Sequence, residues 1–150
     1  MIRKIQIILL ALLLSCNTSY GQALTKEDVK AAFIYHFINF TEWEVPTDGQ
    51  YDVCIPDDRP LRETASMVFS GKIINNHKIF VKSGREGCHV LVSDNVPDSV
   101  NMLTIGPLSK GGMVDFRVVD HKLKFAVNMD NIKRSQLKIS SQLLKMAILE

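Results

Sequence analysis

Apolar residues near the start of the chain recur every three or four positions, at Val29, Phe33, Phe37 and Phe40. That spacing brings side chains onto one face of an α-helix. Thr25 stands just before this stretch and Asp28 follows three residues later, a pair that is typical of a capped helix start. We therefore predict a helix that begins after Thr25 and extends to about Phe40.

The surface of this predicted helix is apolar well beyond that one stripe. The positions outside the stripe are mostly apolar too, namely Ala31, Ile34, Tyr35 and Ile38. Lys30, His36 and Asn39 remain as polar positions. A helix that is apolar nearly all round has to be covered on more than one side. In so small a domain, another subunit could provide the second cover.

Strand-like runs alternate with a helical stretch over the middle of the chain. The runs most typical of strands are residues 51–55, 78–82, 88–93 and 102–105. Asp57 or Asp58 can cap a helix that extends to about Phe69. Its inward face would carry Leu61, Ala65, Val68 and Phe69. Alternation of this kind is typical of a parallel sheet with helical crossovers.

The last third of the chain predicts a different pairing. Residues 113–119 and 122–128 both alternate between apolar and polar side chains around Asp120 and His121, which indicates an antiparallel hairpin. Three further elements follow: a helical turn at 131–135, an extended piece at 137–139, and a final helix with Leu143, Leu144, Ala147 and Ile148 on its apolar face. We therefore predict a single α/β domain with a mixed, mostly parallel sheet flanked by helices and a late antiparallel hairpin.

The first 21 residues have the pattern of a secretory signal. Arg3 and Lys4 precede the apolar run 5–14, which is too short to span a bilayer, because a spanning helix needs about 20 residues. Cleavage after Gly21 would leave residues 22–150 as the mature domain. Alternatively, residues 13–16 resemble a lipobox, in which Cys16 would be acylated. Either interpretation places the domain outside the cytoplasmic membrane, in the periplasm.

The charge of the mature domain excludes one class of partner. The whole chain carries 18 basic and 16 acidic residues, and the signal segment contains two of the basic residues and none of the acidic ones. The mature domain is therefore formally neutral, with 16 residues of each sign. Proteins that bind nucleic acid usually present a basic surface. We expect no nucleic-acid partner.

Two cysteines, Cys54 and Cys88, remain after the signal segment. A cysteine pair in an oxidising compartment most simply forms one disulfide. Both residues lie in predicted strands that can be neighbours in a parallel sheet. The competing interpretation is a redox or metal site, but the chain contains no C-x-x-C motif and its four histidines have no ligand spacing. We predict a structural disulfide and no metal site.

Candidate catalytic residues are few. Ser140 or Ser141 could be combined with His121 and Asp120 as a hydrolase triad, but no G-x-S-x-G motif accompanies them. A serine pair before a Gln-Leu-Leu run is more typical of a helix cap. The glycine-rich segment 106–112 departs from the P-loop pattern, because a glycine stands where lysine is required. We therefore predict no catalytic or cofactor-binding residues and a protein that is not an enzyme.

Two blocks near opposite ends of the chain, residues 29–44 and 122–147, resemble the bracketing motifs of the YfiR-like family of bacterial periplasmic proteins. Motifs between them continue the resemblance in order: Val53-Cys54-Ile55, Gly71-Lys72, Cys88-His89-Val90-Leu91, Gly111-Gly112-Met113 with Phe116, Phe125 with Asn128, and Ile139-Ser140-Ser141 with Leu143-Leu144. The chain departs from the family pattern in two places. Two residues separate Trp43 from Pro46, and no second cysteine pair occurs around residues 111–116.

This resemblance implies a function. Members of the family are α/β domains, often dimeric, that bind and inhibit an inner-membrane diguanylate cyclase and so lower cyclic di-GMP. An outer-membrane lipoprotein can sequester them. For this chain we accordingly expect a cyclase partner, a possible lipoprotein partner and a homodimer. Phe37, Phe40 and Trp43 are the large rigid side chains that we predict as interface anchors.

A second hypothesis is a periplasmic module that senses a small ligand and acts on a kinase or a transporter. In layered α/β domains, ligands bind at the carboxyl ends of parallel strands. That rule would place a cleft between residues 56–59 and 94–97.

Overall fold

A computed structural model of the protein describes residues 21–43, 48–97 and 101–150. The predicted signal segment, including Cys16, lies outside the described residues apart from Gly21. Among the described residues, no helix combines the length and the apolar character that crossing a membrane requires.

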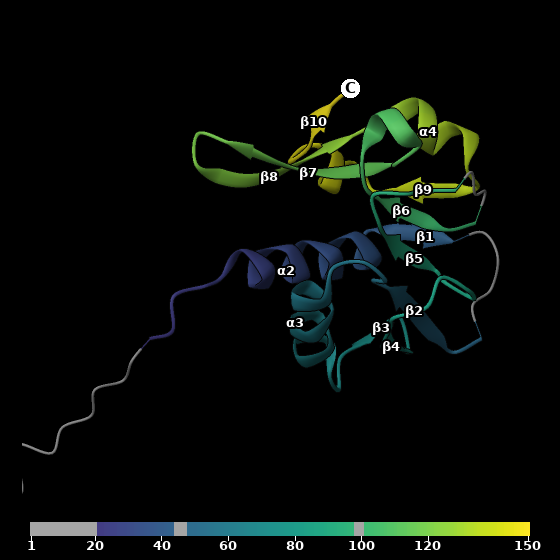
Figure 1. Cartoon of the computed structure of the whole chain (residues 1–150). Coiled ribbons are helices and arrows are strands. Elements are labelled where there is room, and N and C mark those ends of the chain that lie inside the picture. The colour runs from purple at the N-terminus through teal and green to yellow at the C-terminus, as the bar shows by residue number, and fades with distance from the viewer. Residues whose placement is uncertain (1–20, 44–47, 98–100) are drawn as a thin grey trace, which may run out of the picture.

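An eight-stranded mixed sheet organises the described part of the chain, in the order β10-β8-β7-β6-β5-β2-β4-β3. The parallel strands are β2 (Gln50–Cys54), β4 (His77–Lys82), β5 (Val90–Val92), β6 (Leu103–Ile105) and β7 (Val114–Val119). The outer strands are β3 (Ile73–Ile74), antiparallel to β4, then β8 (Lys122–Val127), antiparallel to β7, and β10 (Ile148–Leu149), parallel to β8. The predicted fold class is therefore confirmed, including the late hairpin β7–β8 (Figure 1).

The first helix, α2 (Lys26–Asn39), begins as predicted. The Thr25 hydroxyl accepts a hydrogen bond from the Asp28 N–H at 3.1 Å, and the Asp28 carboxylate accepts one from the Thr25 N–H at 2.8 Å. Helix α2 packs against both α3 (Arg59–Phe69) and the strand β8 (Figure 1). The second cover that its apolar surface requires is thus provided within the chain.

Four aromatic rings join α2 to the hairpin. The ring centroids of Phe37 and Phe125 are 4.9 Å apart, and those of Phe33 and Phe125 are 5.3 Å apart. Phe116 lies 6.1 Å from Phe37 by the same measure. These edge-on and tilted contacts are geometries that aromatic rings favour in protein cores. The core of the domain therefore depends on residues from both ends of the chain.

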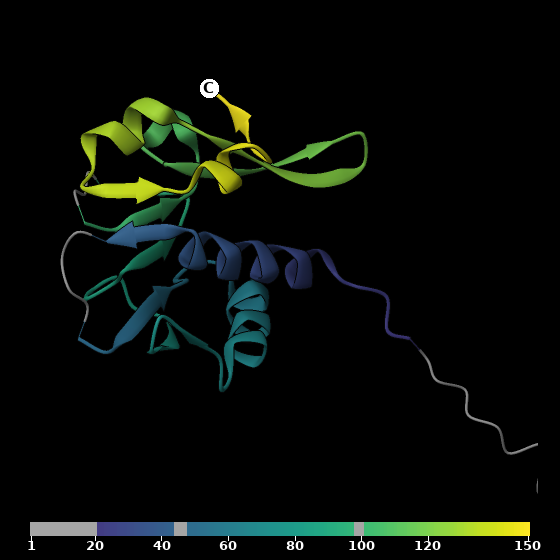
Figure 2. The ribbon, with the colours of Figure 1, turned by 180° about the vertical axis from the view of Figure 1, so that it is seen from behind.

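Two elements near the ends of the chain differ from the prediction. Residues 41–46 were expected only to end the helix, yet β1 (Thr41–Trp43) pairs with β9 (Leu137–Ile139) in a small antiparallel sheet (Figure 2). The final helix, α5 (Ser141–Leu144), is also shorter than expected, and Ile148 belongs to β10 instead of a helix face. Pairing with β8 gives the backbone at Ile148 an alternative to helical hydrogen bonds. Two short helices complete the chain, η1 (Leu108–Lys110) and α4 (Met129–Arg134).

Candidate functional site

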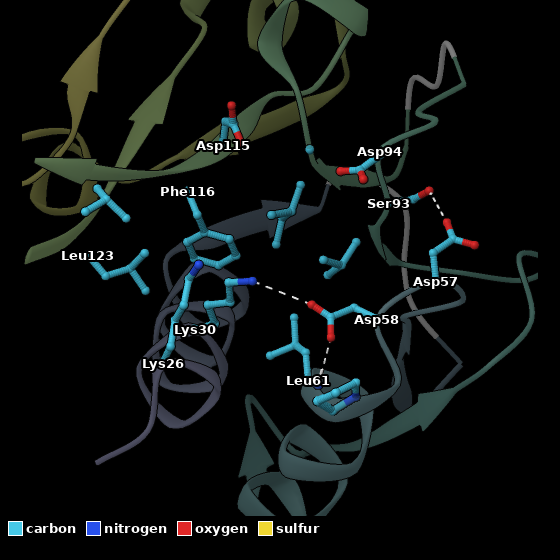
Figure 3. Close-up of a pocket in the computed structure, with 15 residues that line it drawn as sticks. Lys26, Lys30, Asp57, Asp58, Leu61, Ser93, Asp94, Asp115, Phe116 and Leu123 are labelled. Carbon is cyan, nitrogen blue, oxygen red and sulfur yellow. Dashed lines mark hydrogen bonds and ion pairs between the residues drawn. The ribbon is translucent and has the colours of Figure 1, made fainter. Parts of the chain in front are cut away.

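A cleft of about 430 Å³ lies where β2, β5 and β6 end. After β2 the chain continues through α3 to β4, whereas after β5 it continues to β6 on the other side of β2. Connections that diverge in this way open a crevice at the carboxyl ends of parallel strands. The cleft contains Asp57, Asp58 and Asp94, which belong to the two segments that sequence reasoning placed there (Figure 3).

The charged groups on one side of this cleft are largely paired within the chain. Lys30 Nζ lies 3.5 Å from Asp58 Oδ2 and 5.7 Å from the centroid of the Phe116 ring. Asp58 also caps α3 by accepting a hydrogen bond from the Leu61 N–H at 3.0 Å. These contacts fix the start of α3 against α2, so their first role is structural.

The opposite side of the cleft is held by Asp57. Its Oδ2 atom accepts hydrogen bonds from Arg85 at 2.6 Å and from the Ser93 hydroxyl at 2.8 Å. Arg85 also donates to the carbonyl oxygen of Asn95, so one guanidinium connects the segments that follow β2 and β5. Ser93 donates its proton to a carboxylate and forms no hydrogen bond with a histidine in the described part of the chain, so this arrangement does not activate a nucleophile.

Charges of both signs still face the cleft. Lys26 and Asp94 line it and make no ion pair among the described residues. Asp115 points away from the Phe116 ring (Figure 3), because successive strand residues face opposite sides of a sheet. Burial raises the pKa of the Asp115 carboxyl, against the opposing influence of Arg117. No group of His, Cys, Asp or Glu side chains in the described part of the chain could hold a metal ion.

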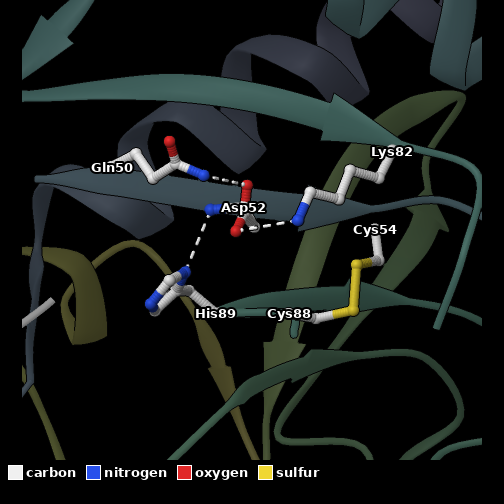
Figure 4. The surroundings of a disulfide bond; sticks show 6 residues. All are labelled: Gln50, Asp52, Cys54, Lys82, Cys88 and His89. Atoms are coloured by element: carbon white, nitrogen blue, oxygen red, sulfur yellow. Dashed lines mark hydrogen bonds and ion pairs between the residues drawn. A yellow bond between two sulfur atoms is a disulfide. The ribbon is translucent and has the colours of Figure 1, made fainter. Parts of the chain in front are cut away.

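The predicted disulfide is confirmed. Cys54 and Cys88 are bonded, with their Cα atoms 5.8 Å apart (Figure 4). Because β2 lies between β4 and β5 in the sheet, the chain has to cross β2 between those two strands. This crossing, residues 83–89, contains no helix. The disulfide fastens the crossing segment to the end of β2.

A buried carboxylate lies beside the disulfide (Figure 4). Asp52 is 6% exposed, and its side chain accepts a hydrogen bond from Gln50 at 2.9 Å and forms an ion pair with Lys82 Nζ at 2.9 Å. Its backbone N–H donates to Nδ1 of His89 at 3.0 Å. An imidazole nitrogen that accepts a hydrogen bond carries no proton. This geometry therefore requires neutral His89.

Burial lowers the pKa of His89 below its usual value, with Asp52 acting in the opposite direction. The unfolded chain binds a proton at His89 near pH 6.5, whereas the folded protein binds it only at lower pH. As the pH falls through about 6.5, the unfolded state therefore holds more protons and the folded state loses stability. We expect the wild type to lose more stability than His89→Asn between about pH 7 and pH 5. Urea denaturation at the two pH values measures this difference, and equal losses would contradict it.

The chain matches a protein family over almost the whole of the described domain. A family model described as YfiR/HmsC-like matches residues 27–148. The chain belongs to the YfiR/HmsC-like family. The resemblance seen in the bracketing motifs is thus confirmed. A comparison with curated proteins gives no match.

The motifs that carried the resemblance hold the YfiR/HmsC-like domain together. A Cβ atom on Gly112 would collide with the carbonyl oxygen of Gly106, so only glycine fits there. The Gly112 carbonyl accepts a hydrogen bond from the Asn131 side chain at 2.7 Å. Asn128 caps α4 by accepting a hydrogen bond from the Asn131 N–H at 2.9 Å. These motif residues therefore have structural roles.

The three predicted interface anchors of this YfiR/HmsC-like chain lie in different environments. Phe37 is completely buried in the core, so its ring presents no surface to a partner. Phe40 and Trp43 are partly exposed. The Trp43 ring packs 5.1 Å from that of Tyr51, measured between centroids, and its buried Nε1 has no hydrogen-bond partner among the described residues. The interface remains a prediction that rests on Phe40 and Trp43.

The residues considered for a hydrolase triad lie in two different parts of the fold. Asp120 and His121 form the turn at the tip of the β7–β8 hairpin, where both have positive φ angles. Ser140 lies at the other end of α2, because its N–H donates to the Phe40 carbonyl at 2.9 Å. The Ser140 hydroxyl accepts a hydrogen bond from the Gln142 N–H at 3.2 Å. In this YfiR/HmsC-like chain Ser140 is thus a helix cap.

Replacing Ser140 with alanine should lower the free energy of unfolding by about 1 kcal/mol, the usual effect of losing a cap. Ser141→Ala is the matched control, because Ser141 is exposed and makes no capping bond in α5. We expect that control to stay within about 0.5 kcal/mol of the wild type. Chemical denaturation of both variants compares them, and equal effects would show that Ser140 is not the cap.

Proposed function

We propose that this protein is a periplasmic regulator that binds and inhibits an inner-membrane signalling enzyme, a diguanylate cyclase, and so lowers cyclic di-GMP. The observation that carries the proposal is the YfiR/HmsC-like family match over residues 27–148. The signal-like segment 1–21 and the disulfide are consistent with an exported protein. A homodimer and a sequestering outer-membrane lipoprotein belong to the same proposal.

Deleting the gene tests the function directly. We expect the cellular concentration of cyclic di-GMP and surface attachment to rise, because the cyclase would lose its inhibitor. A plasmid copy of the full chain should restore both to the wild-type level. A copy without residues 1–21 is the matched control, since it should remain in the cytoplasm and fail to restore them. Unchanged cyclic di-GMP in the deletion strain would rule out the cyclase partner.

A second candidate function is a small-ligand sensor coupled to a kinase or transporter. The cleft at the ends of β2, β5 and β6 favours it, because that is where layered α/β domains bind ligands. A thermal-shift screen with amino acids and nucleotides tests it. A ligand at 100 times its Kd would add about 2.7 kcal/mol of stability. A screen in which no compound raises the melting temperature would count against this function.

A further inference from the structure

The strand β4 has an open outer edge. Its neighbour β3 pairs with it only through Ile73 with Lys78 and Ile74 with His77. On the other side, β2 pairs with β4 along its length, from Lys78 to Lys82. Among the described residues, no strand therefore lies outside the second half of β4. Open strand edges are sites at which another chain can add a strand.

The hydrogen bonds to β2 reveal which backbone groups face this edge. The Lys78 N–H donates to Gly49, and the Lys82 carbonyl accepts from the Ile55 N–H. In a parallel ladder, alternate residues bond to the same neighbour. Lys78, Phe80 and Lys82 therefore bond to β2, and Val81 directs its N–H and carbonyl outward. Val81 thus offers one donor and one acceptor to an added strand.

An apolar groove of about 410 Å³ runs along this edge, between the end of α3 and β4. Its apolar lining consists of Phe69, Ile73, Ile79, Phe80 and Val81. Ile73 is 58% exposed and Phe80 is 46% exposed. Large apolar side chains that gather at the surface mark interaction sites.

The charged side chains that line the groove are positive. Its charged lining residues are Lys72 and Lys78, and neither has an acidic partner within salt-bridge distance in the described part of the chain. Lys72 Nζ instead lies 5.4 Å from the centroid of the Tyr35 ring. Lys82, the next lysine along β4, is already paired with Asp52. An occupant with acidic side chains would complement this edge.

We propose that a partner protein docks an extended segment of alternating apolar and acidic residues on the outer edge of β4. Its backbone bonds to Val81, its apolar side chains fill the groove, and its carboxylates approach Lys72 and Lys78. A second copy of this chain fits less well, because its own β4 edge would bring the same lysines together. That the segment belongs to the inhibited membrane enzyme rests on the proposed function.

Peptide binding tests the edge itself. The probes are two heptapeptides, one alternating valine with glutamate and one alternating valine with lysine. Added to the ¹⁵N-labelled protein, the glutamate peptide should shift amide resonances along β4 and slow the amide exchange of Val81. We expect it to bind at least about tenfold tighter than the lysine peptide, a difference of about 1.4 kcal/mol. Equal binding, or shifts confined to the cleft or to β10, would overturn the proposal.

Two variants make the test specific. Val81→Pro removes the outward N–H and none of the bonds to β2, so the domain should fold and lose the glutamate peptide. Lys72→Glu with Lys78→Glu should reverse the preference between the peptides. Lys122→Glu with Lys124→Glu, exposed on the hairpin, is the matched charge-reversal control and should change nothing. Self-association that strengthens in the Lys72→Glu, Lys78→Glu variant would overturn the proposal in favour of a second copy.

Complementation of the deletion strain separates this inference from the proposed function. The Lys72→Glu, Lys78→Glu chain should fail to restore low cyclic di-GMP, whereas the hairpin control should restore it. If the wild type restores it and the groove variant does so equally well, the regulated enzyme does not dock at β4, although the regulatory function stands. If deletion changes nothing, the cyclase function fails, and the peptide experiment still decides whether the edge binds a strand.

Discussion

Replacing Phe37 with alanine is expected to lower the free energy of unfolding by about 3–5 kcal/mol. The Phe37 ring has no exposed surface and packs against Phe33, Phe116 and Phe125. Removing it leaves a cavity between α2 and the hairpin that neighbouring rings can fill only in part. Urea denaturation followed by circular dichroism gives the free energy of unfolding for variant and wild type.

His36→Ala is the matched control, because His36 is exposed on the same helix one residue earlier. It should change the free energy of unfolding by less than about 0.5 kcal/mol. The pair also separates two roles of Phe37. A Phe37→Ala protein that is as stable as the wild type but no longer binds its partner would place this ring at an interface and contradict its role in the core.

Loss of the disulfide is expected to have the next largest effect. Cys54 and Cys88 are 34 positions apart. In the chain-entropy model, closing a loop of this length stabilises the fold by about 3–4 kcal/mol. Replacing both cysteines with alanine should therefore lower the free energy of unfolding by that amount. Denaturation of the oxidised wild type and of the double variant at neutral pH provides the comparison.

Reductant provides the internal control for this experiment. It should lower the stability of the wild type toward that of the Cys54→Ala, Cys88→Ala protein and leave the double variant unchanged. A difference below about 1 kcal/mol between oxidised wild type and double variant would show that the unfolded chain is already restricted without the bond. In that case the disulfide would serve to hold the crossing segment in place more than to stabilise the domain.

Local sequence patterns predicted those helices and strands that are determined by neighbouring residues. Helix α2 follows from the spacing of its apolar residues and from the capping pair Thr25 and Asp28. The hairpin follows from alternation around Asp120 and His121, which both adopt the positive φ angles of a tight turn. The pairing of β1 with β9 places Trp43 opposite Leu137, and no local sequence pattern near either residue indicates this pairing. Register over such distances is decided by the assembled core.

The candidate sites likewise contain some features that the sequence predicts and others that arise only in the folded chain. The position of the cleft could be predicted because it depends on strand order and direction, which the alternation of strands and helices implies. The ion pairs of Asp57 with Arg85 and of Asp58 with Lys30 could not, because they join segments that meet only after folding. Asp52 gave an available signal, because it is an acidic residue between Tyr51 and Val53 in a predicted strand. Phe37 was predicted as an interface anchor, whereas its ring is buried within the domain. An apolar stripe does not indicate which chain covers it.

The aromatic cluster that joins α2 to the hairpin also determines when the fold can close. As the chain is synthesised from its N-terminus, α2 appears early, but Phe116 and Phe125 follow only much later, and β9 later still. Until then only α3 can cover α2, the side of the helix that faces the hairpin stays exposed, and such surfaces promote aggregation of incomplete chains. The ring closed by Cys54 and Cys88 contains neither the hairpin nor β9, so this bond can form while one side of α2 is still uncovered.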